Sequence, residues 1–369
     1  MSRLILLGNP GTKRTTYLEK GAEEAGIKIH LLEWEKFRLC QNSIPGAENI
    51  ASGEKIFLKI DPPVWESCCL EELNELTHRY EEELHQIEKA GQRWKVSFLN
   101  EPNVIIDLLN KRKCKRHLLK SEIPVTEEIT GFGQEKHYSK ENLSIENHWS
   151  LEENGEPLTS QLLESMTHHR VFQVFIKPVW GSGAAGTAAF RFQPKTGNMA
   201  LYTCAIKNPA TGRLVNTKRL RKFTDRKEVL SMAEQLLRLD CVVERWYAKA
   251  EHKGFSYDLR AVVQDGRIDF ILARLSKGPI TNLHLNNHPL RWQELGLTPK
   301  TMDSIAELCI RAAGCYKGLR SVGIDILLEK GSLRPRIIEM NGQGDLIYQD
   351  IYNHNVIYRH QAEMMKECL

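Results

Sequence analysis

One stretch of the sequence, residues 175–192 (FIKPVWGSGAAGTAAFRF), constrains the fold more than any other. An apolar, strand-like run ends near Lys177, a loop rich in glycine and alanine follows, and a second strand-like run begins near Ala188. A loop with few Cβ atoms allows backbone N–H groups to close on a phosphate chain, and Lys177 supplies positive charge beside it. We therefore expect a β-hairpin that grips phosphate. The alternative is a glycine-rich turn beside a solvated lysine.

The glycine spacing Gly181-x-Gly183-x-x-Gly186 also matches the dinucleotide-binding fingerprint. That fingerprint requires a helix after the loop and an acidic residue about 20 positions later. Here the residues after the loop alternate as in a strand, and neither Asp nor Glu occurs from Gly181 to Thr224. The context therefore excludes a Rossmann site.

Composition narrows the class of protein. The 369 residues are 41% hydrophobic and 27% charged, as in a soluble globular protein of two or three domains. No apolar run has the length of a signal peptide or a membrane span. The nine cysteines form no CxxC pair, which predicts reduced thiols in the cytoplasm and neither a disulfide framework nor a zinc site.

Positive charge is mild overall, at a formal +4, but it gathers in two runs. These are residues 111–117 (KRKCKRH) and 218–222 (KRLRK). We interpret each run as the solvated face of a helix, with nucleic-acid contact as the less favoured alternative. Nucleic acid is therefore not expected as a partner.

The first hundred residues predict a small α/β domain. Residues 4–7 and 27–32 indicate buried strands, and the helical stretch between them predicts parallel pairing. The turn at residues 8–15 (GNPGTKRT) has the wrong glycine spacing for a P-loop, so it is either a plain turn or an anion or substrate loop at a helix start. A strand at 56–60 leads into Asp61-Pro62-Pro63, a stiff loop of the kind that often contacts substrate.

The rest of the chain alternates between helix and strand signals. We expect helices at 70–90, 104–119 and 301–315, and a loop-rich connection over 131–167. Strands are predicted at 171–176, 188–192, 199–205, 241–244, 259–263, 268–273, 324–329 and 336–340.

Three oxygen-bearing side chains fall on two of these strands. Glu339 and Asn341 are two residues apart, so they share one face of a strand, and Asp325 lies among apolar residues on the strand before. Such hard donors suit Mg²⁺ or Mn²⁺ bound to nucleotide phosphates. The alternative is that the acids pair with arginines at the edge of the core. Since clustered carboxylates repel without a cation, we expect Asp325→Asn or Glu339→Gln to leave stability unchanged or raised.

Other polar residues lie at strand ends. Glu244 precedes aromatic residues in a segment where backbone groups can bind an adenine edge, or where aromatics simply fill the core. Arg260 and Arg274 fall on adjacent strands, where they either stabilise a transferred phosphoryl group or form salt bridges. His284 follows in a polar loop, where a lone histidine is more often structural than catalytic.

Taken in order, these residues resemble the ATP-grasp superfamily, and most closely the RimK-like carboxylate–amine ligases, over residues 100–345. Lys111 matches the lysine that contacts the α-phosphate, before Leu118-Leu119 and Ile123-Pro124-Val125. Asn110 stands where the family has Asp, and Glu122 where it has Gly. The resemblance implies Lys177 as the second nucleotide lysine. It implies a loop over the β- and γ-phosphates made by Gly181, Ser182, Gly183 and Gly186.

The same resemblance assigns the remaining site residues. It implies an adenine hinge at Glu244, Arg245, Trp246 and Tyr247. Asp258-Leu259-Arg260 is similar to the family's "DIR" element, and Asn282-Leu283-His284 to its "NLH" loop. Asp325, Glu339 and Asn341 match the metal-binding triad, with Mg²⁺ or Mn²⁺ as the ion.

The fold implied is mixed α/β and α+β, with two α+β lobes that clasp ATP after a small α/β domain. The boundaries expected are 1–100 for the first domain and 101–369 for the ATP-grasp domain, with lobes near 120–240 and 241–369. The activity implied is ATP-dependent ligation of a carboxylate to an amine through an acyl phosphate, with Arg274, Arg260 and His284 at the reacting groups. The alternatives are a small-molecule kinase and a non-catalytic nucleotide-bound binding protein. The resemblance favours a homodimer, small-molecule or peptide substrates and no membrane.

Overall fold

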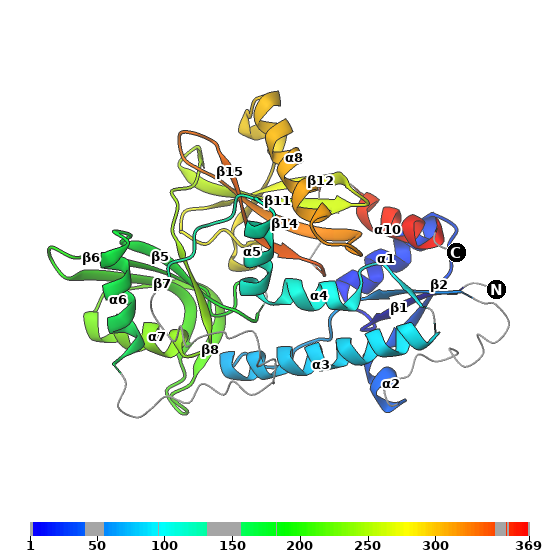
Figure 1. Cartoon of the computed structure of the whole chain (residues 1–369), viewed down its shortest axis with the longest axis horizontal. Coiled ribbons are helices and arrows are strands. Elements are labelled where there is room, and N and C mark those ends of the chain that lie inside the picture. The colour runs from blue at the N-terminus through cyan, green and yellow to red at the C-terminus, as the bar shows by residue number, and fades with distance from the viewer. Residues whose placement is uncertain are drawn as a thin grey trace.

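Three β-sheets organise the chain in the computed structural model, which describes residues 3–40, 55–94, 96–130, 156–181, 183–343, 352 and 354–367 (Figure 1). The first sheet lies near the N-terminus, the second at the left of Figure 1 and the third at its upper centre. The described helices cover these sheets.

The N-terminal sheet is parallel throughout, as the sequence predicts, in the order β2-β1-β3-β4. Its strands are β1 (Arg3–Gly8), β2 (Ile29–Glu33), β3 (Ile56–Ile60) and β4 (Ser97–Phe98). Parallel neighbours need a crossover, and α1 (Lys13–Glu24) supplies the one between β1 and β2. Thr12 caps this helix by accepting a hydrogen bond from the Thr15 N–H.

Two helices cover one face of this sheet. α2 (Trp34–Leu39) and the long α3 (Leu70–Trp94) pack on it, with Tyr80, Leu84 and Ile87 buried at the interface. These are apolar positions of the helix predicted at 70–90. The far half of α3 extends away from the sheet, and the Asn74 amide donates to the Leu239 carbonyl at 3.0 Å. α3 therefore ties the first sheet to the second.

The helix predicted over 104–119 is in fact two helices, so that prediction was wrong. α4 (Pro102–Leu109) ends at Asn110, whose extended backbone (φ −91°, ψ 100°) interrupts the helical hydrogen-bond pattern. The Asn110 side chain then accepts a hydrogen bond from the Lys113 N–H and starts α5 (Lys111–Lys120). The break changes the helix direction and points the first turn of α5 at the glycine loop.

The second sheet is antiparallel, in the order β8-β7-β6-β5-β9. Its strands are β5 (Gln173–Pro178), β6 (Ala188–Gln193), β7 (Asn198–Lys207), β8 (Leu214–Phe223) and β9 (Cys241–Arg245). α6 (Leu158–His168) and α7 (Arg226–Leu237) pack on one face of it and bury Leu162, Met166 and Leu236.

Two predictions fail in this part of the chain. The run 218–222 lies in strand β8 and not on a helix, and its last two residues, Arg221 and Lys222, pair with Thr203 and Tyr202 of β7. The segment 131–167 is not loop throughout, since its last residues form most of α6. Residues 131–155 lie outside the described part of the chain.

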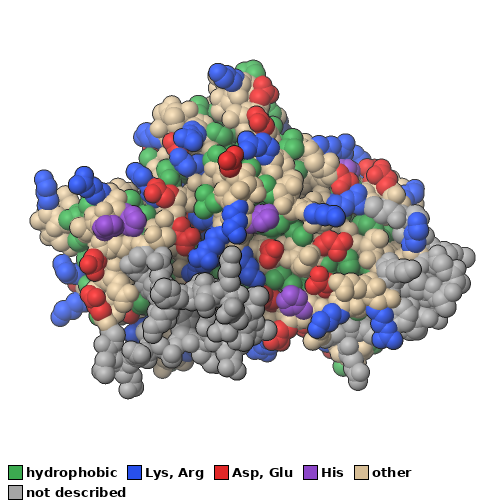
Figure 2. Space-filling model, viewed as in Figure 1, with side chains coloured by type: hydrophobic (Ala, Val, Ile, Leu, Met, Phe, Trp, Pro, Cys, Tyr) green, Lys and Arg blue, Asp and Glu red, His purple; other side chains and the backbone are tan. Residues whose placement is uncertain are grey.

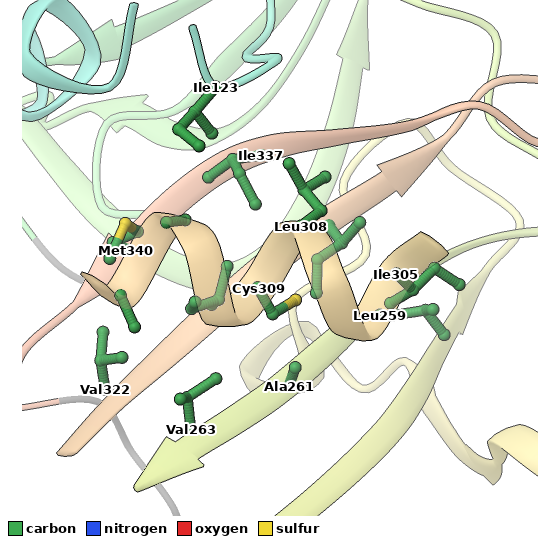
Figure 3. Close-up of a cluster of buried hydrophobic side chains, with 14 of the residues drawn as sticks. Ile123, Leu259, Ala261, Val263, Ile305, Leu308, Cys309, Val322, Ile337 and Met340 are labelled. Carbon is green, nitrogen blue, oxygen red and sulfur yellow. The ribbon is translucent and has the colours of Figure 1, made fainter. Parts of the chain in front are cut away.

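The third sheet carries β13-β12-β11-β14-β15 in order, with β10 paired to β11. The strands are β10 (Glu251–His252), β11 (Phe255–Gln264), β12 (Arg267–Ser276), β13 (His288–Arg291), β14 (Ser321–Leu328) and β15 (Pro335–Asn341). The short helices η2 (Leu283–Leu285) and η3 (Trp292–Leu295) flank β13. α8 (Pro299–Gly314) lies across this sheet, and Ile305, Leu308 and Cys309 pack against Leu259 and its neighbours (Figure 3).

The last described helix returns to the start of the chain. α10 (Val356–Glu367) lies beside α1 (Figure 1) and buries Ile357, Tyr358 and Ala362 there. A Cβ built on Gly21 of α1 would stand 2.7 Å from the backbone N of Arg359, so the two helices approach closely. No helix of the described segments is long and apolar enough to cross a membrane.

Candidate active site

A cleft between the second and third sheets collects most of the residues that the sequence singled out. The predicted residues that line it are Lys111, Lys177, Gly181, Glu244, Arg245, Tyr247, Asp258, Arg274, Asp325 and Glu339. They come from α5, β5, the glycine loop, the end of β9 and the residues after it, and strands β11, β12, β14 and β15. The structure thus brings together residues that are more than 200 positions apart in the chain.

The glycine loop joins two antiparallel strands, β5 and β6, and no helix follows it. Gly181, Gly183 and Gly186 all have positive φ, at 139°, 64° and 67°. A Cβ on Gly186 would also stand 2.7 Å from Cγ of Pro178, so this position admits only glycine without strain. The Lys111 ammonium donates to the Gly181 carbonyl at 2.6 Å, which fixes the loop over the cleft. Ser182 lies outside the described residues.

Lys177 does not project into solvent but belongs to a buried cluster. Its Nζ lies 2.7 Å from Oε2 of Glu244, and Nζ of Lys115 lies 2.7 Å from Oε1 of the same carboxylate. Thr126 also donates to Glu244. Burial by itself would raise the pKa of Glu244, but Lys115 and Lys177 outweigh it and lower that pKa to about 2. Two cations surround one anion, so the cluster keeps one excess positive charge.

The end of β9 and the two residues after it present their side chains alternately to the cleft and away from it. Arg245 and Tyr247 line the cleft, whereas Trp246 packs on the other side against Phe175 and Tyr202, with ring centroids 5.5 and 6.2 Å away. The N–H groups of Arg245 and Trp246 donate to the Glu127 and Gln173 carbonyls. The hinge expected at Glu244–Tyr247 is therefore anchored on both flanks, and Trp246 contributes packing and not a cleft surface.

A second buried network runs along the third sheet. Nε of Arg274 donates to Oδ1 of Asp258 at 2.7 Å, and Nη2 of Arg274 lies 3.1 Å from Oδ2 of Asp325. Arg260 donates to the other oxygen of Asp325, and Lys249 lies 3.4 Å from Asp258. Burial would raise the pKa of Asp258, but Arg274 and Lys249 lower it to about 2. Here too the cations outnumber the carboxylates, three to two.

Arg260 and Arg274 differ in position. Arg274 lines the cleft, whereas Arg260 lies behind Asp325 against β14, where a Cβ on Gly323 would stand 2.6 Å from its Nη1. A glycine within a strand marks such a close approach. Arg260 therefore reaches the cleft only through Asp325.

The three residues proposed for a metal are close but unequal. Pairing of β14 with β15 sets Asp325 opposite Glu339, and Glu339 lies 3.6 Å from Nζ of Lys111. Asn341 lines an adjoining cavity together with Glu339. Asp325 pairs with two arginines, which is the alternative arrangement that the sequence left open. Within the described segments no group of three or more His, Cys, Asp or Glu side chains is disposed to hold a metal ion.

The donor set still fits a magnesium ion in part. Glu339 and Asn341 offer hard oxygen atoms at the cavity wall, and Mg²⁺ in nucleotide sites takes one or two carboxylates with the remaining positions filled by phosphate and water. Asp325 qualifies as a third ligand only if an arginine releases one of its oxygens.

The Asn282–Leu285 segment lies beside the glycine loop. Asn282 lines the cleft, and the exposed His284 sits next to Gly183, since a Cβ there would stand 3.8 Å from Cδ2 of the imidazole. His284 does not line the cleft. Its position suits contact with the loop better than contact with a reacting group.

Sequence reasoning missed three members of the site. Lys115 and Lys249 are buried cations of the two networks, and Thr281 donates to Asp258 and accepts from Lys249 at 2.7 Å. A signal for Lys115 did exist. It lies four residues after Lys111 and next to Cys114, on the buried face of α5, while Lys113 and Arg116 are exposed on the opposite face. Figure 2 shows the exposed Lys and Arg side chains gathered over α5.

Comparison with known proteins supports the fold. No protein-family model matches the sequence, and no curated protein matches it. Among solved structures, the macrocyclase MdnC of Microcystis aeruginosa, bound with precursor peptide MdnA, is similar at a TM-score of 0.58 and 13% identity over 100% of both chains. The ATP-grasp ligase PsnB, complexed with a minimal precursor, Mg and ADP, is similar at 0.56 and 13% over 99% of this chain and 97% of its own. D-alanine–D-alanine ligase from Bacillus anthracis, complexed with ATP, is similar at 0.54 and 12% over 100% and 96%.

These likenesses cover whole chains, so the fold of this chain is the ATP-grasp fold, as the sequence predicts. Mixed parallel and antiparallel sheets agree with the predicted fold class.

Proposed function

We propose that the chain is an ATP-dependent ligase that joins a carboxylate to an amine through an acyl phosphate and releases ADP and phosphate. The observation that carries this proposal is the pair of buried ion networks on the two walls of one cleft. Each contains one more cation than carboxylates, namely Lys115 and Lys177 around Glu244, and Lys249, Arg274 and Arg260 around Asp258 and Asp325. Excess buried positive charge is costly, and a polyphosphate in the cleft offsets it.

The residues divide the work in this proposal. Lys177, Lys111 and the glycine loop bind the phosphate chain, and the Glu244–Tyr247 segment borders the base. Arg274 stabilises negative charge on the transferred phosphoryl group, because its guanidinium lines the cleft and is held in place by Asp258 and Asp325. Arg260 is a positioning residue that orients Asp325. The Mg²⁺ that Glu339 and Asn341 would hold supplies neutralisation of the β- and γ-phosphate charge.

The chemical steps need no nucleophile from the protein. A substrate carboxylate oxygen attacks the γ-phosphorus, the bond from that phosphorus to the bridging oxygen breaks, and ADP leaves. A neutral amine then attacks the acyl carbon, phosphate departs with the bond electrons, and the amine proton passes to phosphate or water. The protein contributes orientation, charge and exclusion of water from the acyl phosphate.

A pocket next to the cleft supports a ligase over a protein that only binds nucleotide. A cavity of about 330 Å³ shares Gly181 and Glu339 with the cleft, so a second molecule can meet the end of the phosphate chain. A kinase would use the same arrangement with a hydroxyl acceptor. The division near residue 100 into a substrate-side α/β domain and an ATP-grasp domain is part of the proposal, with α10 returning to the first domain.

The test is ADP release from ATP and Mg²⁺ with paired carboxylic acids and amines, followed by mass spectrometry of the products. A carboxylate with isotopically labelled oxygen separates the mechanisms. A ligase transfers one labelled oxygen to the released phosphate and requires both substrates. A stable phosphorylated product without need of an amine would assign a kinase, and binding of ATP without turnover of any pair would leave only a nucleotide-binding role.

A further inference from the structure

The cavity beside the cleft is built largely by the N-terminal domain. Its volume of about 330 Å³ is at the lower end of the range for small-molecule sites. Its walls come from the loops after β1 and β3, from the first turn of α1, from α3 and α4, and from the end of β15. The Asn9 amide donates to the Pro62 carbonyl at 2.9 Å and ties the two loops together. The cavity is therefore formed before any ligand arrives.

Arg14 is a partly buried cation of this cavity without a counterion among the described residues, whereas the neighbouring Lys13 is exposed. It lies in the first turn of α1 and lines the cavity, and its Nη1 is buried without a hydrogen-bond partner. No carboxylate of the described segments forms an ion pair with it. A partly buried guanidinium without a counterion is costly, so its retention here indicates an anion that comes from outside the chain.

Asp61 lies in the same wall, and one of its two carboxylate oxygens has no hydrogen-bond partner. It is only 6% exposed, its Oδ1 accepts from Lys59, and its Oδ2 is buried without a partner. Asp61 and Arg14 both line the cavity and also a smaller polar space of about 20 Å³ behind it. The same wall thus contains an acceptor and a cationic donor that each have an atom without a partner.

One part of the cavity wall is apolar. Trp65 and Tyr80 meet edge to face with centroids 5.8 Å apart, and Leu108 and Leu109 continue the wall. The Tyr80 hydroxyl already donates to Gln343 at 2.8 Å, so this ring offers only its apolar body. A ligand with an apolar side chain and a compact, oppositely charged pair of groups matches such a surface.

We propose that this cavity takes an α-amino acid with an apolar side chain, with its carboxylate on the Arg14 guanidinium and its amino group on the Asp61 carboxylate. The inference rests on the proposed ligase activity, in which this amino acid is the amine substrate. Since Glu339 and Gly181 line both spaces, the cavity adjoins the cleft in which the acyl phosphate would form.

The test is calorimetric binding to protein saturated with a non-hydrolysable ATP analogue and Mg²⁺. The probes are L-leucine, L-phenylalanine, L-methionine and L-isoleucine, each also as its carboxamide. At least one free acid should bind, and its amide should bind about 10–100-fold more weakly, because the amide lacks the charge that pairs with arginine. Arg14→Met should weaken binding of the free acid by a similar factor, so that the acid and its amide bind with equal affinity.

Two variants and the nucleotide itself serve as controls. Lys20→Met removes an exposed cation from the same helix outside the cavity and should change nothing. Trp65→Ala should weaken L-phenylalanine while leaving analogue binding intact. The analogue's affinity, measured on every variant, shows that the protein is folded.

The outcomes separate this inference from the proposed function. If the analogue binds but no amino acid does, or if acid and amide bind equally, the pocket assignment is overturned and the spare atoms belong to buried water. The ligase proposal survives that result. If the analogue fails to bind to the unaltered protein, the proposed function fails whatever the amino acids do.

Discussion

Lys115 and Glu244 form an ion pair of 2.7 Å between a helix and a strand, and both side chains are almost fully buried. Lys177 reaches the second oxygen of the same carboxylate at the same distance. One acid therefore holds two lysines inside the protein. The stability of the cleft wall and its charge depend on that single carboxylate.

Replacing Glu244 by Gln should strongly destabilise the protein. The change leaves two buried ammonium groups without a counterion, and breaking a buried pair costs about 3–5 kcal/mol. Urea denaturation at neutral pH measures the loss in the free energy of unfolding. Glu127→Gln is the matched control, because Glu127 pairs with Arg245 at 3.3 Å where both are about half exposed, and it should cost less than about 1 kcal/mol. Equal stability of Glu244→Gln and the unaltered protein would contradict the assignment.

Acid should destabilise the protein through the same carboxylate. Despite burial, its lysine neighbours hold the pKa of Glu244 at about 2, below its ordinary 4.5, and Asp258 behaves alike beside Arg274. Because the folded pKa is the lower one, the unfolded chain binds more protons between these values. The stabilisation is thus complete above about pH 4.5 and is lost as the pH falls towards about 2. The free energy of unfolding, plotted against pH in that window, should be less steep in Glu244→Gln. An identical slope would show that Glu244 is not responsible.

Lys177 of β5 and the lysines of α5 should differ sharply in their effect on nucleotide affinity. Lys177→Met should raise the Kd for ATP about 10–100-fold by removing a charge-assisted contact. Lys115→Met should raise it about tenfold, because Glu244 then neutralises Lys177. It should not lower stability, since burial already depresses the pKa of Lys115 and Met removes that unfavourable charge. Lys113→Met, on the exposed face of α5, should leave the Kd unchanged. Calorimetry measures the Kd for ATP of each variant. Equal affinities for the Lys113 and Lys177 variants would contradict the assignment of the cleft as the ATP site.

Replacing Asp325 and replacing Glu339 should have different effects on stability. Asp325→Asn removes the shared partner of Arg260 and Arg274 and should cost about 3–5 kcal/mol of stability. This reverses the expectation from sequence that the change would be neutral or stabilising. Glu339→Gln breaks only a 3.6 Å contact with Lys111 and should cost less than about 1 kcal/mol. Turnover should fall in both, by about 10³-fold if each serves phosphoryl transfer. An Asp325→Asn variant as stable as the unaltered protein would contradict the pairing of Asp325 with both arginines.

Local pattern predicts the parts of this site that depend on neighbours in the chain. The hairpin at the glycine loop follows from alternation after Thr187, and the shared face of Glu339 and Asn341 follows from strand periodicity. Parallel pairing of β1 with β2 follows from the intervening helix. These features need no knowledge of the rest of the fold.

Tertiary contacts decide the rest. The burial of Lys249 depends on Asp258 and Thr281, which no local pattern connects to it. Arg260 lies behind Asp325 and not in the cleft because Gly323 leaves it room. Strand β8 was not predicted, because its charged run is half exposed and shows no clear alternation of apolar and polar residues. The break between α4 and α5 could have been predicted, because Asn110 is a typical N-cap residue.

The docking of α10 on α1 has a consequence for how the protein is made. Leu18 and Ala22 of α1 share one buried cluster with Ile357, Tyr358 and Ala362 of α10. During translation, the part of this surface that α10 covers therefore stays exposed until the residues of α10 have been synthesised. We expect nascent chains stalled before residue 356 to recruit chaperones through that surface and to release them once α10 emerges.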